Sequence, residues 1–410
     1  MSRRVAEILT IGDELLSGET VDSNSAHISK VLEELGVPVR RHTSVADDVR
    51  AIAEAVVEAT DRAQIVITSG GLGPTRDDLT FEAVARALGV ELRHHAETWE
   101  RIASRRRSAG RPLTDNLRRQ AMLPVGVEVL GNEVGSAPGI WAKRGAASLF
   151  VLPGVPREMR WLLEHRVVPC LPPGPRIARD TLAVAGLGES ALETALAEVI
   201  AGHPDVQVGF RAQPYENEVK LRAEGDSAEE RVAAAAAAVR AALGSRVFGG
   251  RGARLEAELV QRLSAAGATV ATAESCTGGL VAKLLTDVPG SSATVLGGIV
   301  AYANSVKTEL LGVDPEALAR EGAVSEVVAI QMAEGARVRA GAQFGLSTTG
   351  VAGPGGGTED KPVGTVWTAI AGPDGVQARK LFLPNRTREL VRLETAKALL
   401  DELRLRLISA

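Results

Sequence analysis

The segment Gln64-Ile65-Val66-Ile67-Thr68, followed directly by Ser69-Gly70-Gly71-Leu72-Gly73, is typical of a buried strand that ends in a glycine-rich turn. The segments before it alternate between short apolar strands and amphipathic helices. This alternation predicts an α/β domain in which helices cover both faces of a parallel sheet. Ligands of such sheets bind at the carboxyl ends of the strands. We expect strands at residues 5–11, 37–45 and 64–68, and helices at residues 24–35 and 48–63.

Two segments rich in proline or glycine divide the chain into three expected domains. Four prolines lie in residues 167–175, where they can neither continue a helix nor pair in the centre of a sheet, so we expect a stiff linker. A small α+β module with a helix at residues 190–201 follows, and Gly249-Gly250-Arg251-Gly252 precedes a second alternation of helices and strands. The predicted domains are an N-terminal α/β domain at residues 1–170, the module at 171–250 and a C-terminal α/β domain at 251–410.

Composition and charge narrow the classes of function. An apolar fraction of 45% with 24% charged residues is that of a soluble globular protein. The net charge of −4 leaves no basic excess to attract a phosphate backbone, which argues against general nucleic-acid binding. Two cysteines are too few for a disulfide framework or a four-cysteine zinc site. No apolar run reaches the length of a membrane helix or of a signal-peptide core, so we expect a cytoplasmic protein.

The last third of the chain contains a candidate nucleophile but no histidine. All six histidines lie at or before residue 203, whereas Ser275 follows an expected strand at residues 269–273 and precedes a helix. The N–H groups of a helix start suit an oxyanion, and without an imidazole a lysine must act as the base. This combination predicts attack of a serine hydroxyl on an acyl carbon. The alternative that Ser275 or Thr277 only caps the helix stays open, and Cys276 is a rival nucleophile.

Lys307 is the candidate base. It follows Asn304 and Ser305, two good caps for an expected helix at residues 306–311, and so lies in the first turn, where the helix dipole disfavours an ammonium. We therefore expect its pKa to fall from the usual ~10.4, which would let the neutral amine accept a proton. Tyr302, on the strand expected before it, could relay or orient that proton. The alternative is a surface lysine beside a core tyrosine.

Two glycine-rich segments are candidate binding loops. Residues 347–357 contain five glycines that offer N–H groups to an anion, the alternative being a flexible turn. In residues 68–78 the glycines could cradle a pyrophosphate while Asp77 and Asp78 hold a hard cation. The alternative there is a glycine turn with an aspartate cap. Further polar residues lie at predicted strand or helix ends and could come together at the same binding site. They are Glu14, Asp22-Ser23-Asn24 and Asp47.

The C-terminal segments resemble those of the competence/damage-inducible protein A (CinA) family, and the resemblance extends over the whole chain. It implies that the C-terminal domain is an amidase, which converts nicotinamide mononucleotide to nicotinic acid mononucleotide and ammonia without metal or cofactor. By this likeness Ser275 is the nucleophile, Lys307 the base and Tyr302 its partner. The residues then expected to bind the substrate or shape this site are Thr277, Gly278, Asn304, Thr349, Gly350 and Arg388.

The N-terminal segments, together with Leu152-Pro153-Gly154-Val155-Pro156-Arg157-Glu158-Met159, resemble the molybdopterin-binding fold of the MogA and MoaB type as used in the CinA family. The resemblance implies an ADP-ribose pyrophosphatase that needs a divalent metal, Mg²⁺, Mn²⁺ or Co²⁺. The expected metal ligands are Glu14, Asp47, Asp77 and Asp78. The expected substrate-binding residues are Ser23, Asn24, Gly70, Gly71, Gly73, Pro153, Gly154 and Arg157.

Two alternatives stay open beside this two-site hydrolase. Relatives that act on molybdopterin share the glycine loop and the acidic residues, so likeness of fold does not choose the N-terminal substrate. The family name also suggests a competence-linked adaptor with vestigial sites, although the acidic net charge and 3% aromatic content argue against direct DNA contact. The expected partners are therefore the two nucleotides and a second copy of the chain in a homodimer, with no nucleic acid and no membrane.

Overall fold

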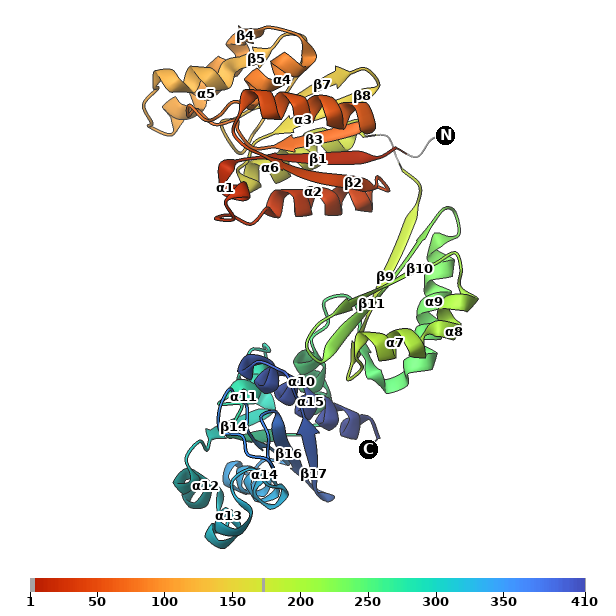
Figure 1. Cartoon of the computed structure of the whole chain (residues 1–410), viewed down its shortest axis with the longest axis vertical. Coiled ribbons are helices and arrows are strands. Elements are labelled where there is room, and N and C mark those ends of the chain that lie inside the picture. Colours follow the sequence, from red (N-terminus) through yellow and green to blue (C-terminus); the bar gives the residue numbers. More distant parts are fainter. Residues whose placement is uncertain (1–3, 172–173, 410) are drawn as a thin grey trace. The chain divides into compact units, whose positions relative to one another are not determined.

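The computed structural model describes residues 4–171 and 174–409, which fall into two compact units, Met1–Ile177 and Ala178–Ala410 (Figure 1). Pro172 and Pro173 of the expected linker lie outside the described residues. The second unit contains both the small module and the C-terminal sheet, so the division into three domains stays a prediction. No helix in the described part of the chain is long and apolar enough to cross a bilayer.

A six-stranded sheet forms the centre of the first unit, in the order β2-β1-β3-β8-β7-β6. The first four strands are parallel, as the alternation of strands and helices predicts. β7 and β6 continue the sheet in antiparallel orientation, so the expectation of a purely parallel sheet is wrong at this edge. Antiparallel neighbours need no crossover helix, which is why the alternation stops here. The strands are β1 (Ala6–Ile11), β2 (Val39–Val45), β3 (Ile65–Ser69), β6 (Glu128–Leu130), β7 (Gly139–Arg144) and β8 (Ala147–Leu152).

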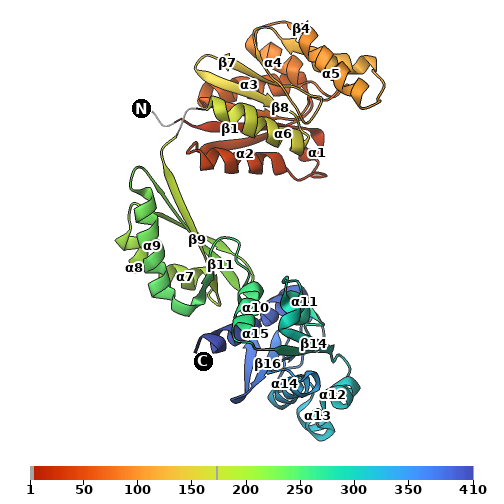
Figure 2. The same ribbon diagram turned by 180° about the vertical axis from the view of Figure 1, so that it is seen from behind.

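Helices cover both faces of this sheet because neighbouring strand residues point to opposite sides. The helices α3 and α4 lie on one face and α2 and α6 on the other (Figures 1 and 2). Leu9 and Val66 pack with the first pair, and Ile8 and Ile67 with the second. The helices are α1 (Asp13–Leu16), α2 (Ser23–Glu34), α3 (Val49–Arg62), α4 (Thr80–Leu88), α5 (Ala96–Ser108) and α6 (Pro156–Leu162). Shorter elements are β4 (Leu92–His94), β5 (Met122–Pro124), the 3-10 turn η1 (Asp115–Ala121), the π-helical turn η2 (Leu163–Val167) and the 3-10 turn η3 (Val168–Cys170).

The second unit begins with a four-stranded sheet in the order β10-β11-β9-β12. Its strands and helices alternate as the sequence predicts, but the single helix expected at residues 190–201 is two helices, because the chain leaves helical geometry at Leu196. The strands are β9 (Ile177–Ala185), β10 (Gln207–Ala212), β11 (Glu216–Glu224) and β12 (Val247–Gly249). The helices are α7 (Glu189–Ala195), α8 (Ala197–Gly202) and α9 (Ala228–Leu243), followed by the 3-10 turn η4 (Gly244–Arg246).

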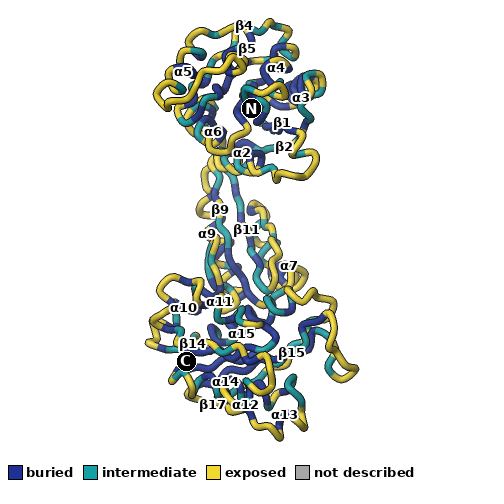
Figure 3. The backbone as a smooth tube through the Cα atoms, turned by 90° about the vertical axis from the view of Figure 1, so that its left-hand side faces the viewer, coloured by how far each residue is buried: buried dark blue, intermediate teal, exposed yellow. Residues whose placement is uncertain are grey.

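A five-stranded sheet, β14-β13-β15-β16-β17, forms the rest of the second unit, and its central strands are buried (Figure 3). The first three strands are parallel and the last two antiparallel. One face packs against α10, α11 and α15, and the other against α12, α13 and α14. The strands are β13 (Val270–Glu274), β14 (Val295–Val300), β15 (Phe344–Gly350), β16 (Thr365–Gly372) and β17 (Gly375–Phe382). The helices are α10 (Leu255–Ala265), α11 (Leu280–Thr286), α12 (Asn304–Leu311), α13 (Pro315–Glu321), α14 (Glu326–Ala340) and α15 (Arg388–Ser409), with the 3-10 turn η5 (Ser291–Ala293) before β14. The expected α/β fold class is confirmed.

Buried polar contacts join the two sheets of the second unit. Lys397 of α15 donates to Glu216 of β11 at 2.7 Å and to Glu256 of α10 at 2.6 Å. Burial alone would raise the pKa of Glu256, but the hydrogen bond and charge of Lys397, together with hydrogen bonds from the backbone and from Arg254, lower the pKa overall. One turn later on α15, Asp401 accepts a hydrogen bond from Tyr215 at 3.1 Å. The long C-terminal helix therefore anchors the small module to the C-terminal sheet.

We predict that Lys397→Met destabilises the chain by about 3 kcal/mol at neutral pH, because Glu216 and the buried Glu256 lose their shared cation. Arg254, which donates to Glu256 at 2.8 Å, offsets part of this loss. The stabilising effect of Glu256 is present above the pKa of an unfolded glutamate and is lost as the pH falls through its lowered folded pKa. The difference between variant and wild type should thus shrink in acid. Urea denaturation at several pH values measures this, with the exposed Lys380→Met as the matched control; equal midpoints for the two variants would contradict it.

Candidate functional site

The carboxyl ends of three parallel strands meet at one edge of the C-terminal sheet. The N–H of Ser275, directly after β13, donates to the Thr348 carbonyl of β15 at 2.9 Å. The N–H of Ala301, directly after β14, donates to the Glu274 carbonyl at 2.8 Å. These bonds extend the strand pairing by one residue, so the chain segments with Ser275, Tyr302 and Thr349 leave the sheet at the same edge.

Ser275 begins a turn of residues 275–279 and does not lead directly into a helix. The helix α11 starts at Leu280, and the buried carboxylate of Glu274 accepts the N–H groups of Val281 and Ala282 at 3.0 and 2.7 Å. The expectation that this helix start faces an oxyanion at Ser275 is therefore wrong, because those donors are taken. The capping alternative is wrong as well: the buried Thr277 hydroxyl is paired with the Thr348 hydroxyl at 2.6 Å, and no side chain at the N-cap position binds the helix.

Arg392 of α15 fixes this serine turn. Its Nε and Nη2 atoms donate to the Thr277 carbonyl at 3.0 and 2.6 Å. Gly278, with a φ of +59°, allows the close approach, since a Cβ there would lie 3.2 Å from Arg392 Nη2. The sequence analysis missed Arg392. Its spacing of four residues from Arg388 on one helix was the available signal, because such residues share a helix face.

Lys307 is buried, with 1% of its surface exposed, so the alternative of a surface lysine is wrong. Its Nζ donates to the carbonyls of Ala301 at 2.7 Å and Tyr302 at 3.2 Å. Burial lowers the pKa of this lysine, in the expected direction. The helix α12 begins at Asn304 with Ala303 as its N-cap, so Asn304 and Ser305 are helical residues and not the caps that we expected.

Tyr302 lies between β14 and α12, not on a strand, and its side chain is 64% exposed. Its hydroxyl accepts a hydrogen bond from Arg388 Nη2 at 3.1 Å, while Arg388 Nη1 donates to the Gly353 carbonyl at 2.8 Å. The alternative of a core tyrosine is thus wrong. Among the described residues the contact between Tyr302 and Lys307 runs through the tyrosine carbonyl.

The remaining predicted residues of this edge differ in their exposure. Thr349 is buried and its hydroxyl donates to the Ala323 carbonyl at 2.7 Å, so that hydroxyl is engaged within the protein. Gly350 has no room for a side chain, because a Cβ would lie 2.7 Å from the Thr365 carbonyl oxygen. Gly278 and Asn304 are exposed. Burial raises the pKa of Cys276 to about 12, which keeps this neighbour of Ser275 a protonated thiol at neutral pH.

The corresponding edge of the first unit brings several predicted residues together. Asn24 Nδ2 donates to Ser69 Oγ at 3.0 Å and to the Gly154 carbonyl at 2.8 Å, and Ser69 Oγ donates to the Pro153 carbonyl at 3.1 Å. Gly70, with a φ of +122°, must be glycine, since a Cβ would lie 2.1 Å from the Ile11 carbonyl oxygen. Asn24 Oδ1 is buried and has no hydrogen-bond partner within the described residues.

Other predicted residues of this edge lie at its surface. Gly71 has a φ of +63° and packs against the Thr80 hydroxyl, which donates to the Gly70 carbonyl at 2.9 Å. Ser23 is the exposed first residue of α2. Arg157 is exposed and donates to the Val134 carbonyl at 3.1 Å.

Carboxylates cluster beside this edge. The N–H of Asp13 donates to the Asp47 carboxylate at 3.0 Å, and the N–H of Asp47 donates to the Asp13 carboxylate at 3.2 Å. Burial raises the pKa of Asp47, and the negative charges of Asp13, Glu14 and Asp77 raise it further. Asp13 is a second residue that the sequence analysis did not assign, although it adjoins Glu14 at the end of β1.

The carboxylates meet the requirements of a metal site only in part. Asp78 accepts the N–H groups of Gly73 and Thr75 at 2.5 and 2.7 Å, which closes its own loop and does not fit a ligand role. Within residues 4–171 and 174–409, no three His, Cys, Asp or Glu side chains have the arrangement of a metal site. The mutual repulsion at Asp47 nevertheless fits a cation that one or two carboxylates and the phosphates of a substrate would hold together.

Models of three protein families match successive parts of the chain. They are the probable molybdopterin binding domain at residues 7–173, the damage-inducible protein CinA KH domain at residues 179–249 and the CinA C-terminal domain at residues 252–407. Among solved structures, the protein CinA with unknown function from Thermoplasma acidophilum is 35% identical and covers 42% of this chain and 100% of its own, with a TM-score of 0.39. The competence/damage inducible protein from Agrobacterium tumefaciens is 42% identical and covers 38% of this chain and 97% of its own, with a TM-score of 0.36.

Curated relatives match over nearly the full length. A CinA-like protein of Desulfosudis oleivorans is 44% identical over 418 residues, which are 98% of this chain and 100% of that protein. A CinA-like protein of an Anaeromyxobacter species (strain Fw109-5) is 45% identical over 406 residues, which are 98% of each chain. With this identity along its whole length and all three domain models in order, the chain belongs to the CinA family.

Proposed function

We propose that this protein is a hydrolase with two sites that act on pyridine nucleotides. The C-terminal site would deamidate nicotinamide mononucleotide to nicotinic acid mononucleotide and ammonia. The observation that carries this proposal is that Lys307 is buried and its pKa is lowered. Lys307 lies at the same sheet edge as the serine turn, and the C-terminal domain contains no histidine that could act as the base. The first test is incubation of the purified protein with nicotinamide mononucleotide and analysis of the products; absence of both ammonia and the acid would refute the activity.

In the proposed reaction the Ser275 hydroxyl attacks the amide carbon, and its proton passes to the neutral Nζ of Lys307. The lysine then gives this proton to the departing nitrogen, which leaves as ammonia while an ester to Ser275 remains. Water cleaves the ester, with Lys307 again accepting a proton, and releases the carboxylate product and the serine. Arg388 lies exposed beside Tyr302 and Gly353, where its planar guanidinium suits the phosphate of a mononucleotide.

The N-terminal site would hydrolyse ADP-ribose to AMP and ribose 5-phosphate. A divalent metal, Mg²⁺, Mn²⁺ or Co²⁺, would supply charge neutralisation at the phosphates when bound. Asp47 would hold a water molecule and accept its proton, while Glu14 and Asp77 would hold the metal. The glycine loop at Gly70, Gly71 and Gly73 would lie against the pyrophosphate, because side chains are absent there.

A molybdopterin-handling N-terminal domain is the second candidate, and one observation favours it: residues 7–173 match the family described as a probable molybdopterin binding domain. Both ligands carry phosphate and would use the same glycine loop. Incubation with ADP-ribose, with and without EDTA, separates them, since only a pyrophosphatase releases AMP in a metal-dependent way. A competence-linked adaptor would turn over neither nucleotide.

We predict that Ser275→Ala abolishes release of ammonia from nicotinamide mononucleotide and leaves ADP-ribose cleavage unchanged, because the two sites lie in different compact units. Asp47→Asn should abolish ADP-ribose cleavage and leave the release of ammonia unchanged. Chromatography of both reactions with both variants measures this. Loss of both activities in a folded Ser275→Ala protein would contradict the prediction that the two sites act independently.

For Lys307 we predict that kcat/KM for deamidation rises with pH and levels off above the lowered pKa, because only the neutral amine accepts a proton. Lys307→Arg should be nearly as inactive as Lys307→Met, since a guanidinium stays charged and cannot act as a base. The measurement is kcat/KM across pH for all three proteins, with circular dichroism as the check of folding. Substantial activity in Lys307→Arg would exclude the role of general base.

For Arg392 we predict a positioning role. Arg392→Met should lower kcat about tenfold to hundredfold with little change in KM, because the serine turn loses the two donors that hold Thr277. The kcat of Arg392→Lys should lie between those of wild type and Arg392→Met, since one ammonium cannot replace a planar pair of donors. Arg240→Met, an exposed change in α9, is the matched control. A change confined to KM would indicate substrate contact in place of positioning.

A further inference from the structure

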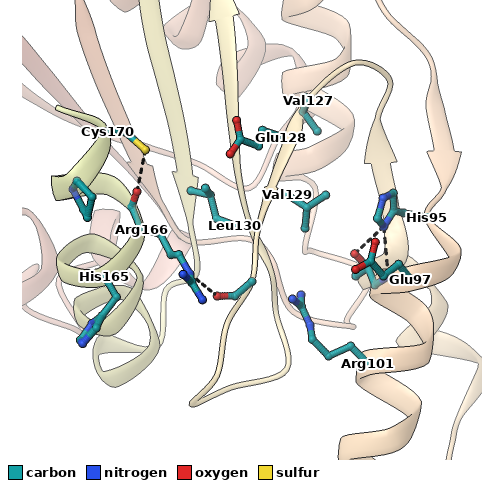
Figure 4. A pocket seen from close by; sticks show the side chains of 13 residues that line it. His95, Glu97, Arg101, Val127, Glu128, Val129, Leu130, His165, Arg166 and Cys170 are labelled. Carbon is teal, nitrogen blue, oxygen red and sulfur yellow. Dashed lines mark hydrogen bonds between the residues drawn. The ribbon is translucent and has the colours of Figure 1, made fainter. Parts of the chain in front are cut away.

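A cavity of about 720 Å³ lies in the first unit along β6, the edge strand of the sheet (Figure 4). Its walls come from the start of α5, from residues 127–131 and from residues 165–170. Because β6 is the last strand of the sheet, no further strand of the described chain covers its outer side. The volume is within the range of about 300–1,000 Å³ that small-molecule sites occupy. None of the residues proposed for the two catalytic sites lines it.

Arg101 of α5 is the unusual side chain of this cavity. Its Nη2 atom is buried and has no hydrogen-bond partner within the described residues. Burial lowers the pKa of Arg101, and the positive charge of Arg166 lowers it further while Glu97 opposes this effect. An arginine stays charged in proteins, so a guanidinium nitrogen that is buried and unpaired costs free energy until an acceptor reaches it.

The surrounding residues do not supply this acceptor. Arg166 extends from the opposite wall, as Figure 4 shows, but it is a second cation that donates to Glu133 at 2.9 Å. Glu97, one turn before Arg101 on α5, is exposed and does not accept a hydrogen bond from the Nη2 atom of Arg101. Gly131 leaves room for the guanidinium, because a Cβ there would lie 2.7 Å from Arg101 Nη1. Arg101 thus lines the cavity with a guanidinium whose buried Nη2 atom has no acceptor among the described residues.

Apolar side chains form another part of the lining, which also includes the carboxylates of Glu97 and Glu128. Val127, Val129, Leu130 and Pro169 offer hydrocarbon surface beside the two guanidinium groups. A ligand that satisfies both parts of the lining has an apolar body and an oxyanion, to which Arg101 can donate a charge-assisted hydrogen bond when its guanidinium turns into the cavity. Inorganic phosphate would meet only the first requirement, and a neutral aromatic amide only the second.

We propose that this cavity is a binding site for a small organic oxyanion, a carboxylate or phosphate ester with an apolar body, and that Arg101 is the residue that recognises the oxyanion. The site is separate from the two proposed catalytic sites. Its occupancy therefore does not depend on whether the proposed reactions are correct.

The test is calorimetric titration of the full chain with benzoate, benzamide and inorganic phosphate as probes. We expect benzoate to bind about tenfold more tightly than benzamide, and Arg101→Met to weaken benzoate binding at least about tenfold, the effect of one lost charge-assisted hydrogen bond. Arg160→Met, an exposed change on α6, is the matched control and should bind as wild type. Benzoate binding that is equal in Arg101→Met and wild type, or absent from wild type, would overturn the proposal.

Two further variants keep the proposal testable if Arg101→Met binds or folds poorly for other reasons. Glu97→Gln should tighten benzoate binding, because it removes the negative charge next to Arg101. Asn24→Ala should leave benzoate binding unchanged. Loss of benzoate binding in that variant would mean that benzoate binds at the edge with the glycine loop and not in the cavity. Without ligand, Arg101→Met should unfold at a higher temperature than wild type, since it removes the unpaired buried charge; a lower midpoint would mean that Arg101 is structural.

Discussion

The clamp that Arg392 forms on the Thr277 carbonyl couples the serine turn to the longest helix of the second unit. The same helix, α15, carries Arg388, which contacts Tyr302 and Gly353, and Lys397, which joins α10 to the small module. A helix is rigid over this length, so these contacts hold the serine turn, the glycine-rich loop and the module in one fixed relation. The geometry of the candidate site thus depends on residues that approach neither the serine nor the lysine base.

Two buried lysines of this unit show how partners decide the chemistry of an amine. Lys397 faces two carboxylates, whose charges offset the cost of burial. Lys307 has only two backbone carbonyls, and a dipole solvates an ammonium less well than a carboxylate does. Burial is therefore left to lower the pKa of Lys307. The same residue type stabilises structure at one position and is suited to accept a proton at the other.

The fold was predictable where the signal was local. Buried strand runs such as residues 65–69 and the helices between them predict the parallel strands, and parallel strands end at one edge, which brings Ser275 and Tyr302 together. Contacts between distant residues were not predictable: Arg392 and Thr277 are 115 residues apart. The contact of Glu274 was not predictable either, because nothing in the sequence says that its carboxylate turns back onto the start of α11. The three-residue strand β6 was too short to give a pattern.

The two sheet edges use the same geometry with opposite charge. At the edge of the first unit, burial and the charges of Asp13, Glu14 and Asp77 raise the pKa of Asp47, so the protein concentrates negative charge that a cation would neutralise. At the edge of the second unit, the guanidinium of Arg392 contacts the serine turn and that of Arg388 contacts Tyr302, and these two cations suit an anionic substrate. Because the two edges carry opposite charge, they are unsuited to the same substrate. They fit the proposed division of labour, in which a pyrophosphate and a divalent cation would bind at the first edge and a mononucleotide at the second.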